Sequence, residues 1–300
     1  MSPPSAFRRA AEAMLALLTP ERDLALPAEF DSALIRLEES TWPQVVVSWS
    51  RLTPSGFPVE VTALPDGCCQ WAAEVAGPEL PETARLSRAL ALLDDAGQPV
   101  APAVRRSLLT GQSGRELRFG AWLGGCGPDL KLYAELPGGL GACRPGLPLP
   151  GPLAAGLTLL PRGTLCRMYG DSPARRRGEL YFRLPDVEAV DLLPFLRATG
   201  HSGLLDVLRA NLPDGLRRLS GRRLGLSISW KADESTEPTL IVSARTLFPG
   251  HPAGLLQLAP QLSVLGAHFG GLRPCGVTLA SHPTRFEVLA AVGLCPLGPA

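Results

Sequence analysis

The order of helical and strand-forming segments constrains this chain more than any single motif does. Segments with apolar residues at helical spacing alternate with pairs of short strand-forming segments that are separated by turn residues. The five predicted strand pairs are Pro58–Leu64 with Cys69–Val75, Leu117–Leu123 with Leu130–Leu136, Leu165–Tyr169 with Glu179–Leu184, Leu224–Lys231 with Thr239–Arg245, and Val277–Ser281 with Arg285–Val292. This order recurs at intervals of about 50 to 70 residues. It predicts one antiparallel sheet with its helices on one face.

One or two helices are expected between successive strand pairs. The predicted helices are Phe7–Leu18, Ala28–Glu39, Pro81–Asp95, Gly151–Leu160, Val187–Ala198, Gly203–Ala210 and Ala253–Phe269. The segment Val45–Arg51 is either the end of a helical layer or an extra strand. A sheet of ten strands with a regular outer layer of helices would have no unpaired edge strand if it closed into a barrel. We therefore predict an α+β fold, a single domain over residues 1–300 in which about ten antiparallel strands form a closed barrel surrounded by helices.

Side-chain alternation distinguishes the two faces of the predicted sheet. In Leu130–Leu136, Lys131 and Tyr133 fall on one face, and the leucines fall mostly on the other. The segments Glu179–Leu184 and Leu226–Lys231 alternate in the same way. Because the apolar face is expected to lie under the helices, the polar face lines the interior. The barrel is therefore expected to have a polar, solvent-filled lumen.

The same alternation, followed through every predicted strand, gives a set of side chains that face the lumen. The set consists of Glu60, Gln70, Glu74, Arg118, Trp122, Lys131, Tyr133, Arg167, Tyr169, Arg177, Glu179, Tyr181, Arg183, Lys231, Thr239, Arg245, His282 and Arg285. Both lysines of the chain belong to it. Several cations and tyrosines on one enclosed wall are typical of a site for a multiply charged anion, most simply a diphosphate. The alternative is a solvated sheet face paired by ordinary salt bridges.

Charge and cysteine usage exclude several classes of protein. The chain carries 29 basic and 28 acidic residues, a net charge of +1, so no basic field predicts binding to nucleic acid or to an anionic membrane. Its apolar runs are too short for a transmembrane helix. The seven cysteines and four histidines show no metal-ligand spacing, which predicts reduced thiols in a cytoplasmic protein and no zinc site.

Other phosphate-binding motifs are absent from the sequence. It contains no GxxxxGK[ST] loop and no GxGxxG motif after a predicted strand. Asp94 and Asp95 lack the third aspartate of a DDxxD metal motif. Diphosphate binding would therefore rest on side-chain cations, and we expect no cofactor and no obligatory magnesium ion.

Several short segments resemble the dimethylallyltryptophan synthase-type aromatic prenyltransferases. The segments that carry the resemblance are LTPSGFPVEV at Leu52–Val61, EVAGP at Glu74–Pro78, RFGAW at Arg118–Trp122, DLKLY at Asp129–Tyr133 and RGELY at Arg177–Tyr181. Enzymes of this family fold as the ABBA barrel, in which five ααββ units surround ten antiparallel strands. The resemblance thus implies the architecture that the order of elements also predicts, in a compact form similar to the bacterial members.

The resemblance implies a base and a diphosphate site. By this likeness, Glu60 is the carboxylate that accepts a proton from the aromatic acceptor. Arg118, Lys131 and Arg177 hold the prenyl diphosphate, where they neutralise the charge that grows on the leaving group as the allylic C–O bond breaks.

The resemblance also implies an aromatic shield. Tyr133 and Tyr181 match family tyrosines whose rings stabilise the allyl cation and exclude water from it. Lys231 and Arg245 are further inward cations of the diphosphate site, placed by alternation alone.

The sequence departs from the family pattern at two matched positions and in the last strands. Gln70 stands where the family has a diphosphate-binding arginine, and Glu179 replaces a lysine beside the leaving group. Thr239–Arg245 and Arg285–Val292 lack shielding tyrosines. These departures leave open that the chain has changed its substrate or lost the reaction.

The resulting prediction is an enzyme, an aromatic prenyltransferase of secondary metabolism. It transfers a prenyl group from an allylic diphosphate to an electron-rich aromatic acceptor, an indole, a phenol or an aromatic side chain of a peptide, by Friedel–Crafts-type electrophilic substitution. One alternative is a divergent barrel that binds a small molecule or peptide without chemistry. Another is an interaction protein with an exposed apolar patch on its helices. We expect no nucleic-acid or membrane partner, and a monomer or homodimer.

Overall fold

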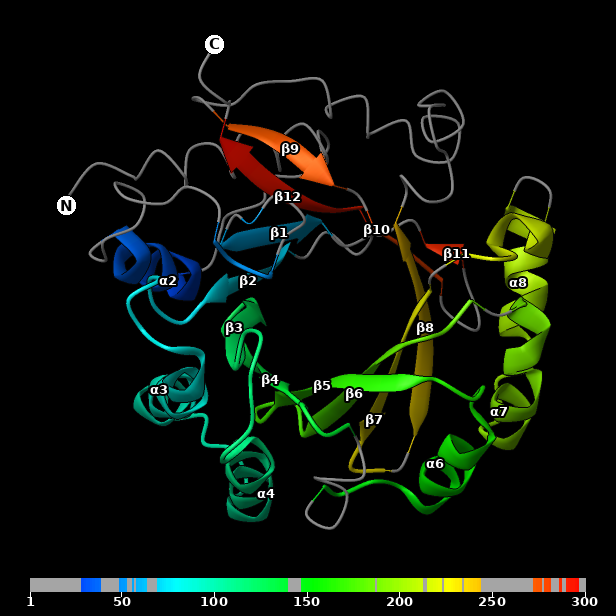
Figure 1. The fold of residues 1–300 in the computed structure, drawn as a ribbon, viewed down its shortest axis with the longest axis horizontal. Coiled ribbons are helices and arrows are strands. Elements are labelled where there is room, and N and C mark those ends of the chain that lie inside the picture. Colours follow the sequence, from blue (N-terminus) through cyan, green and yellow to red (C-terminus); the bar gives the residue numbers. More distant parts are fainter. Residues whose placement is uncertain are drawn as a thin grey trace.

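One antiparallel sheet, strongly curled, organises the computed structural model of this protein (Figure 1). The structure describes residues 28–38, 49–52, 56, 58–63, 69–139, 147–186, 188–212, 215–222, 224–233, 235–243, 272–276, 278–281, 286–287 and 290–296. Its 12 strands neighbour one another in the order β11-β10-β8-β7-β6-β5-β4-β3-β2-β1-β12-β9. The helices lie along the outer side of the curl (Figure 1).

From β1 to β8 the described strands follow the chain in the predicted order, whereas β9 was not predicted. The strands are β1 (Val59–Ala63), β2 (Cys69–Glu74), β3 (Ala121–Cys126), β4 (Asp129–Glu135), β5 (Leu165–Ser172), β6 (Arg177–Arg183), β7 (Gly225–Lys231), β8 (Thr236–Ser243), β9 (Leu272–Gly276), β10 (Thr278–Ser281), β11 (Phe286–Glu287) and β12 (Ala290–Pro296). The helices are α2 (Ala28–Glu38), α3 (Glu82–Asp95), α4 (Pro102–Gln112), α6 (Gly151–Gly156), α7 (Leu193–Ala198) and α8 (Leu204–Asn211), with short 3-10 turns η2 (Leu157–Leu159), η3 (Ala189–Leu192) and η4 (Gly215–Leu219).

Strands β1 to β8 confirm the first four predicted strand pairs. Each pair is antiparallel, β1 with β2, β3 with β4, β5 with β6, and β7 with β8. Successive pairs join side by side through β2–β3, β4–β5 and β6–β7. Eight strands in chain order thus form one continuous wall. The predicted helices Phe7–Leu18 and Ala253–Phe269, and most of Val45–Arg51, lie outside the described residues.

Helix α3 shows how the outer layer is attached to the wall. Its apolar residues Leu86, Ala89, Leu90 and Leu93 recur at spacings of three and four residues, so they share one face of a helix. All four are buried in the main hydrophobic core. Each buried leucine contributes about 1.5–3 kcal/mol relative to an exposed one. This face therefore fixes α3 against the sheet.

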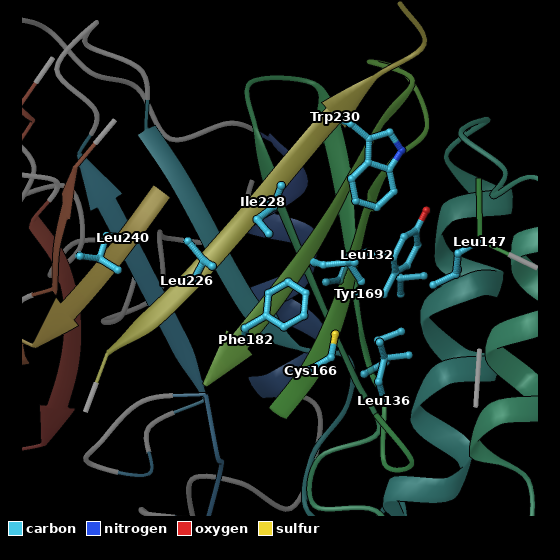
Figure 2. Close-up of a cluster of buried hydrophobic side chains, with 14 of the residues drawn as sticks. Leu132, Leu136, Leu147, Cys166, Tyr169, Phe182, Leu226, Ile228, Trp230 and Leu240 are labelled. Atoms are coloured by element: carbon cyan, nitrogen blue, oxygen red, sulfur yellow. The ribbon is translucent and has the colours of Figure 1, made fainter. Parts of the chain in front are cut away.

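The outward face of the sheet forms the core with the helices (Figure 2). Leu132 of β4, Leu180 of β6 and Ile228 of β7 are each completely buried. Trp230 packs over Gly178 of the neighbouring strand, and a methyl group added there would lie 2.4 Å from the indole ring. Alternation of the intervening residues places the polar side chains on the other face, as the sequence predicts.

The predicted lumen position of Tyr169 is wrong. A β-bulge between Cys166 and Met168 adds a residue to β5 and reverses the alternation beyond it. Tyr169 therefore lies opposite Leu180 on the outward face, where it is completely buried and its ring centroid is 6.1 Å from that of Trp230. In this part of β5, Met168 stands opposite Tyr181 and lies on the inward face.

The predicted strand position of Arg118 is also wrong. Strand β3 begins at Ala121, and Arg118 lies in a preceding bend with an exposed side chain. The bend ends at Gly120, which has a positive φ of 68° and whose added Cβ would lie 2.0 Å from the Glu82 carbonyl oxygen. Only glycine fits this close approach. Strand β3 is therefore shifted toward the C-terminus relative to the prediction, whereas β4 begins one residue before its predicted start.

The C-terminal strands extend the sheet at both of its ends. Strand β10 pairs with β8, whereas β12 pairs with both β1 and β9. Only residue 277 separates β9 from β10 in the chain. No helix within the described residues combines the length and apolar character needed to cross a membrane.

Candidate active site

Lys131 is the centre of a compact group of side chains on the inward face of the sheet. From β4, its Nζ donates hydrogen bonds to Glu179 Oε2 at 2.6 Å and to Tyr181 Oη at 2.7 Å, both on β6. The Nζ atom also lies 4.7 Å from the ring centroid of Tyr133 and 5.3 Å from that of Tyr181. Two aromatic rings thus meet one cation. We call Lys131, Tyr133, Glu179 and Tyr181 the Lys131 cluster.

A glycine on the strand between β4 and β6 makes the Lys131 cluster possible. Gly170 of β5 lies opposite Tyr133 on one side and Glu179 on the other. A methyl group added to it would lie 3.0 Å from Lys131 Cε and 3.2 Å from Tyr181 Cε2. The missing side chain therefore lets the aliphatic stem of Lys131 cross β5 and reach the carboxylate on β6.

The charges of the Lys131 cluster compensate each other. Burial opposes ionisation of Glu179, but the charges of Lys131 and Arg177 and the hydrogen bonds to the carboxylate together lower the pKa of this carboxyl below its usual value. Burial likewise opposes the charge on Lys131, yet the Glu179 carboxylate raises the pKa of the ammonium. Burial and the nearby Glu179 hold the pKa of Tyr181 well above its usual value. At neutral pH the cluster therefore holds one ion pair and a neutral phenol.

Arg177 lies on the same face, two residues before Glu179 on β6. Its Nη2 donates a hydrogen bond to Ser229 Oγ at 2.6 Å and lies 3.4 Å from Glu237 Oε2. In the ladder it stands opposite Lys231, whose own side chain is exposed. Arg177 also acts electrostatically on both Lys131 and Glu179. The structure thus brings Lys131 and Arg177 together, as predicted, and each has a carboxylate partner.

Gln70 connects strand β2 to the Lys131 cluster. Its Nε2 donates a hydrogen bond to Tyr133 Oη at 3.0 Å. The Tyr133 ring reaches toward β2 by crossing Gly124 of β3, where an added methyl group would lie 2.9 Å from Tyr133 Cε2. From the sequence, Gln70 is known only as the residue that stands in place of a family arginine. Its contact shows that it positions the ring that faces Lys131.

Glu60 stands on β1, on the same row of the ladder as Lys131. The row runs from Glu60 to Ala72, then to Gly124, then to Lys131. Three strand spacings correspond to about 14 Å along the wall. Small residues fill the two positions between them. The base and the cation predicted from the sequence therefore face a shared stretch of the inner wall.

Burial sets the ionisation of Glu60. It raises the pKa of this carboxyl to about 7, and no charge or hydrogen bond of a described residue adds to this effect. Among the described residues, the Glu60 side chain has no hydrogen-bond or ion-pair partner. A carboxyl with a pKa near neutrality exchanges protons readily at physiological pH, as a general base requires.

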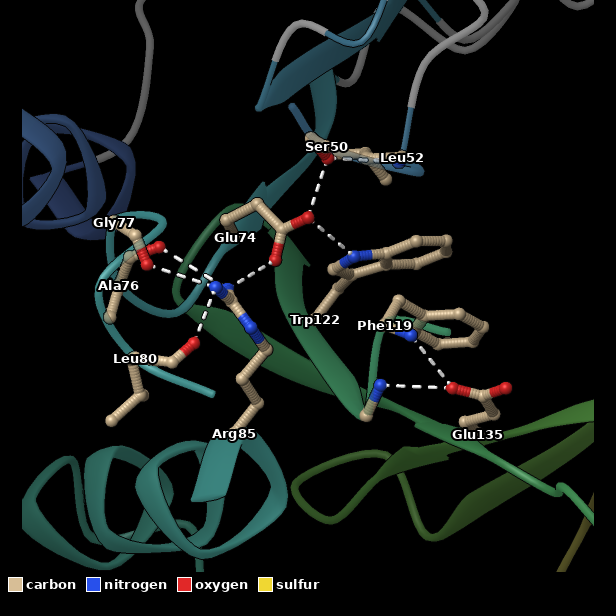
Figure 3. A network of polar contacts seen from close by, with 11 residues as sticks. Ser50, Leu52, Glu74, Ala76, Gly77, Leu80, Arg85, Phe119, Trp122 and Glu135 are labelled. Atoms are coloured by element: carbon tan, nitrogen blue, oxygen red, sulfur yellow. Dashed lines mark hydrogen bonds and ion pairs between the residues drawn. The ribbon is translucent and has the colours of Figure 1, made fainter. Parts of the chain in front are cut away.

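Two other inward carboxylates hold the structure together instead (Figure 3). Glu74 accepts hydrogen bonds from Ser50 Oγ and from Trp122 Nε1, and it forms a 2.7 Å ion pair with Arg85 of α3. Glu135 accepts hydrogen bonds from three successive backbone N–H groups, those of residues 118 to 120. Glu74 is therefore engaged through both of its carboxylate oxygens, and Glu135 through Oε2. The sequence analysis did not identify the role of Arg85, because its partners come from other elements.

The remaining predicted site residues do not join the Lys131 cluster. Arg118 and Lys231 are exposed, and Arg245 lies outside the described residues. Their predicted roles in diphosphate binding stay predictions. Within the described residues, no three His, Cys, Asp or Glu side chains are grouped so that they could hold a metal ion. The expected independence from metal ions is likewise still a prediction.

Replacing Gly170 with alanine is expected to destabilise the protein by about 1 kcal/mol. In a strand, glycine to alanine ordinarily stabilises, because it reduces the freedom of the unfolded chain. At Gly170 the new methyl group must displace Lys131 or Tyr181, so the substitution lowers the free energy of unfolding instead of raising it. Urea unfolding measures the effect. The control is Gly151→Ala, where the methyl group meets nothing within 4 Å; equal or greater stability of Gly170→Ala would contradict the packing described above.

Comparison with known proteins connects this fold to enzymes of one kind. No protein-family model matches the sequence, and no curated protein matches it. A solved structure of a 6-dimethylallyl tryptophan synthase is similar with a TM-score of 0.61 and 16% identity, covering 96% of this chain and 100% of that one. At this identity the likeness is one of fold.

Two further structures are similar over nearly their whole lengths. The 6-dimethylallyltryptophan synthase from Micromonospora olivasterospora, in complex with DMASPP and Trp, has a TM-score of 0.63, 15% identity and coverage of 98% of this chain and 96% of its own. The 5-dimethylallyl tryptophan synthase from Streptomyces coelicolor, also in complex with DMASPP and Trp, has a TM-score of 0.59, 14% identity and coverage of 99% and 98%. The chain therefore has the fold of bacterial dimethylallyl tryptophan synthases, the fold that the resemblance implies.

Proposed function

We propose that this protein is an aromatic prenyltransferase that uses an allylic diphosphate as donor and an electron-rich aromatic compound as acceptor. The Lys131 cluster carries the proposal. It holds a cation against two tyrosine rings on the inward face, and it shares a ladder row with Glu60, whose carboxyl has no partner among the described residues. The whole-length similarity to dimethylallyl tryptophan synthases supports the same reaction class.

The first step of the proposed reaction is ionisation of the donor. Lys131 and Arg177 bind the diphosphate and neutralise the charge that it gains as the allylic C–O bond breaks. The Tyr133 and Tyr181 rings, whose centroids are 6.0 Å apart, present electron-rich faces to the allyl cation. Burial holds the pKa of Tyr181 well above its usual value, so its phenol stays neutral and its ring stabilises the cation without trapping it.

The second step forms the new C–C bond and releases a proton. The acceptor lies on the stretch of wall between Lys131 and Glu60, where Ala72 and Gly124 present little side-chain bulk. An electron pair of the aromatic ring attacks the allyl cation, giving an arenium ion. Glu60, ionised above a pH of about 7, takes the proton and restores aromaticity. The products are the prenylated arene and diphosphate.

We further infer that the sheet closes into a barrel around this site. Strands β9 and β10 are separated by one residue and pair with β12 and β8 at opposite ends of the strand order. If β9 and β10 are counted as one strand, that strand joins the two ends of the strand order. If β11 and β12 are also counted as one strand, they form the second strand of the fifth pair. Ten strands then complete the ring. A closed wall supports the function because it keeps water away from the allyl cation.

The decisive test is turnover with purified protein. Dimethylallyl diphosphate and geranyl diphosphate are supplied with tryptophan, indole or a simple phenol, with and without magnesium, and mass spectrometry detects the prenylated product. Lys131→Met is expected to lower kcat/KM by about 10²-fold or more. The comparison variant is Arg118→Met, which removes an exposed guanidinium and is expected to have a smaller effect.

A second function, a barrel that binds its ligand without chemistry, is favoured by one observation. Lys131 is already paired with Glu179, so less positive charge is free for a diphosphate. This alternative predicts saturable binding of an aromatic ligand with no product from any donor. Product formation that is lost in Lys131→Met excludes it, whereas binding without turnover in the wild type overturns the prenyltransferase proposal.

A further inference from the structure

Glu179 is an anion at the point where the proposed function requires a second anion to bind. Its carboxylate accepts the 2.6 Å hydrogen bond from Lys131 Nζ, and only 14% and 11% of the two side chains are exposed. Glu179 thus already pairs with the cation that a bound diphosphate would need. A position that supplies positive charge in the related family supplies negative charge here.

Every element packed against Glu179 contributes to its environment. Strand β4 presents Lys131 and Tyr133, and β6 presents Arg177 and Tyr181 on either side of Glu179 itself. Strand β5 presents only Gly170 at this level. The facing residues of the next two strands are Ser227 and Ser229 of β7 and Glu237 of β8.

The charges of Lys131, Glu179, Arg177 and Glu237 sum to zero. Lys131 pairs with Glu179, and Arg177 lies 3.4 Å from Glu237. A diphosphate that reached Lys131 would meet the ionised Glu179 carboxylate at close range. Two anions that share one enclosed site raise the pKa of the carboxyl, because ionising both is costly. A protonated Glu179 would instead offer an O–H donor to a phosphate oxygen.

We propose that Glu179 is a specificity-determining residue that leaves Lys131 and takes up one proton when a diphosphate binds. This inference rests on the proposed function, since it assumes that the Lys131 cluster is the diphosphate site. Its consequence is a site that accepts a diphosphate together with a proton. The direction of the pH dependence follows. Glu179 is ionised in the free protein and protonated in the complex, so affinity falls as pH rises, by at most about tenfold per pH unit.

The test is calorimetric titration with inorganic pyrophosphate, without magnesium, on the wild type and on Glu179→Gln from about pH 6 to about pH 8. Glutamine keeps the shape of protonated glutamate but cannot ionise. We expect Glu179→Gln to bind more tightly, and its advantage over the wild type to grow with pH. Taking the ratio of the two dissociation constants cancels the ionisation of pyrophosphate itself.

Two controls separate this effect from simpler ones. Glu237→Gln removes a carboxylate of equal charge that is 43% exposed, so its gain in affinity is expected to be smaller and independent of pH. Titration of the wild type in two buffers with different ionisation enthalpies measures proton uptake directly. This measurement needs no variant, so it holds even if Glu179→Gln, which leaves Lys131 unpaired, folds poorly.

The outcomes distinguish the inference from the proposed function. If the wild type binds pyrophosphate but takes up no proton beyond that of the ligand, or Glu179→Gln binds no more tightly at any pH, the inference is overturned and the proposed function stands. If neither the wild type nor Glu179→Gln binds pyrophosphate at millimolar concentration, both are overturned. Proton uptake at Glu179 without prenyl transfer supports the inference and refutes the enzyme.

Discussion

Glu60→Gln is expected to lower kcat for prenyl transfer by about 10²- to 10⁴-fold, the range for loss of a general acid or base. Glutamine preserves the size of the side chain but cannot accept a proton at physiological pH. Because Glu60 is three strands away from Lys131, pyrophosphate binding should change much less than turnover. Steady-state kinetics and calorimetry on the same preparation measure the two effects.

The pH profile supplies an independent signature of the same residue. Burial raises the pKa of Glu60 to about 7, and the active form of a base is the ionised one. The rate of the wild type should therefore rise with pH up to about 7 and level off above it. The residual activity of Glu60→Gln should lack this rise.

A matched variant controls for the loss of one carboxylate. Glu116→Gln changes an exposed glutamate in the segment before β3 and is expected to leave the kinetics unchanged. If Glu60→Gln retained most of its turnover, or kept the rise with pH, another residue would have to accept the proton. That result would remove Glu60 from the mechanism while leaving the diphosphate site in place.

Arg85→Met is expected to lower the free energy of unfolding by about 3–5 kcal/mol, the usual cost of breaking a buried ion pair. Arg85 bonds Glu74 at 2.7 Å and donates to the carbonyl oxygens of Gly77 at 2.9 Å and Leu80 at 2.8 Å. Methionine fills a similar length but donates nothing. The change therefore leaves a buried carboxylate and several carbonyl groups without partners.

The control for this measurement is an exposed ion pair on a neighbouring helix. Arg105 of α4 pairs with Asp94 of α3, and both side chains are about one third exposed. Arg105→Ala is expected to cost less than about 1 kcal/mol. Urea unfolding compares the two variants. A loss for Arg85→Met as small as that of Arg105→Ala would show that the Glu74–Arg85 network does not connect α3 firmly to the sheet.

Alternation along single strands located the core of the candidate site. Lys131 and Tyr133 are two residues apart on one strand, as are Glu179 and Tyr181, so each pair must share a face whatever the rest of the chain does. The order of hairpins then predicts that the two strands are close neighbours. This reasoning is local, and it holds wherever a strand is regular.

The same reasoning failed where a strand is irregular. The bulge in β5 reversed the alternation at Tyr169, and the bend before β3 removed Arg118 from the strand. Neither the bulge nor the bend produces a periodic pattern of residues, so a sequence pattern does not predict them. The glycine at position 120 was visible in the sequence, but the lack of space for a side chain there comes from the nearby carbonyl of Glu82.

The order of hairpins and helices, the inward face and most of the residue types on it follow from sequence patterns. The partners of those residues follow from the fold. Strand register, and glycines that let side chains cross between strands, decide that Lys131 meets Glu179, that Arg85 bonds Glu74 and that Glu60 has no partner among the described residues. Alternation follows from neighbours along one strand, whereas pairing depends on residues from distant segments packed to within hydrogen-bonding distance.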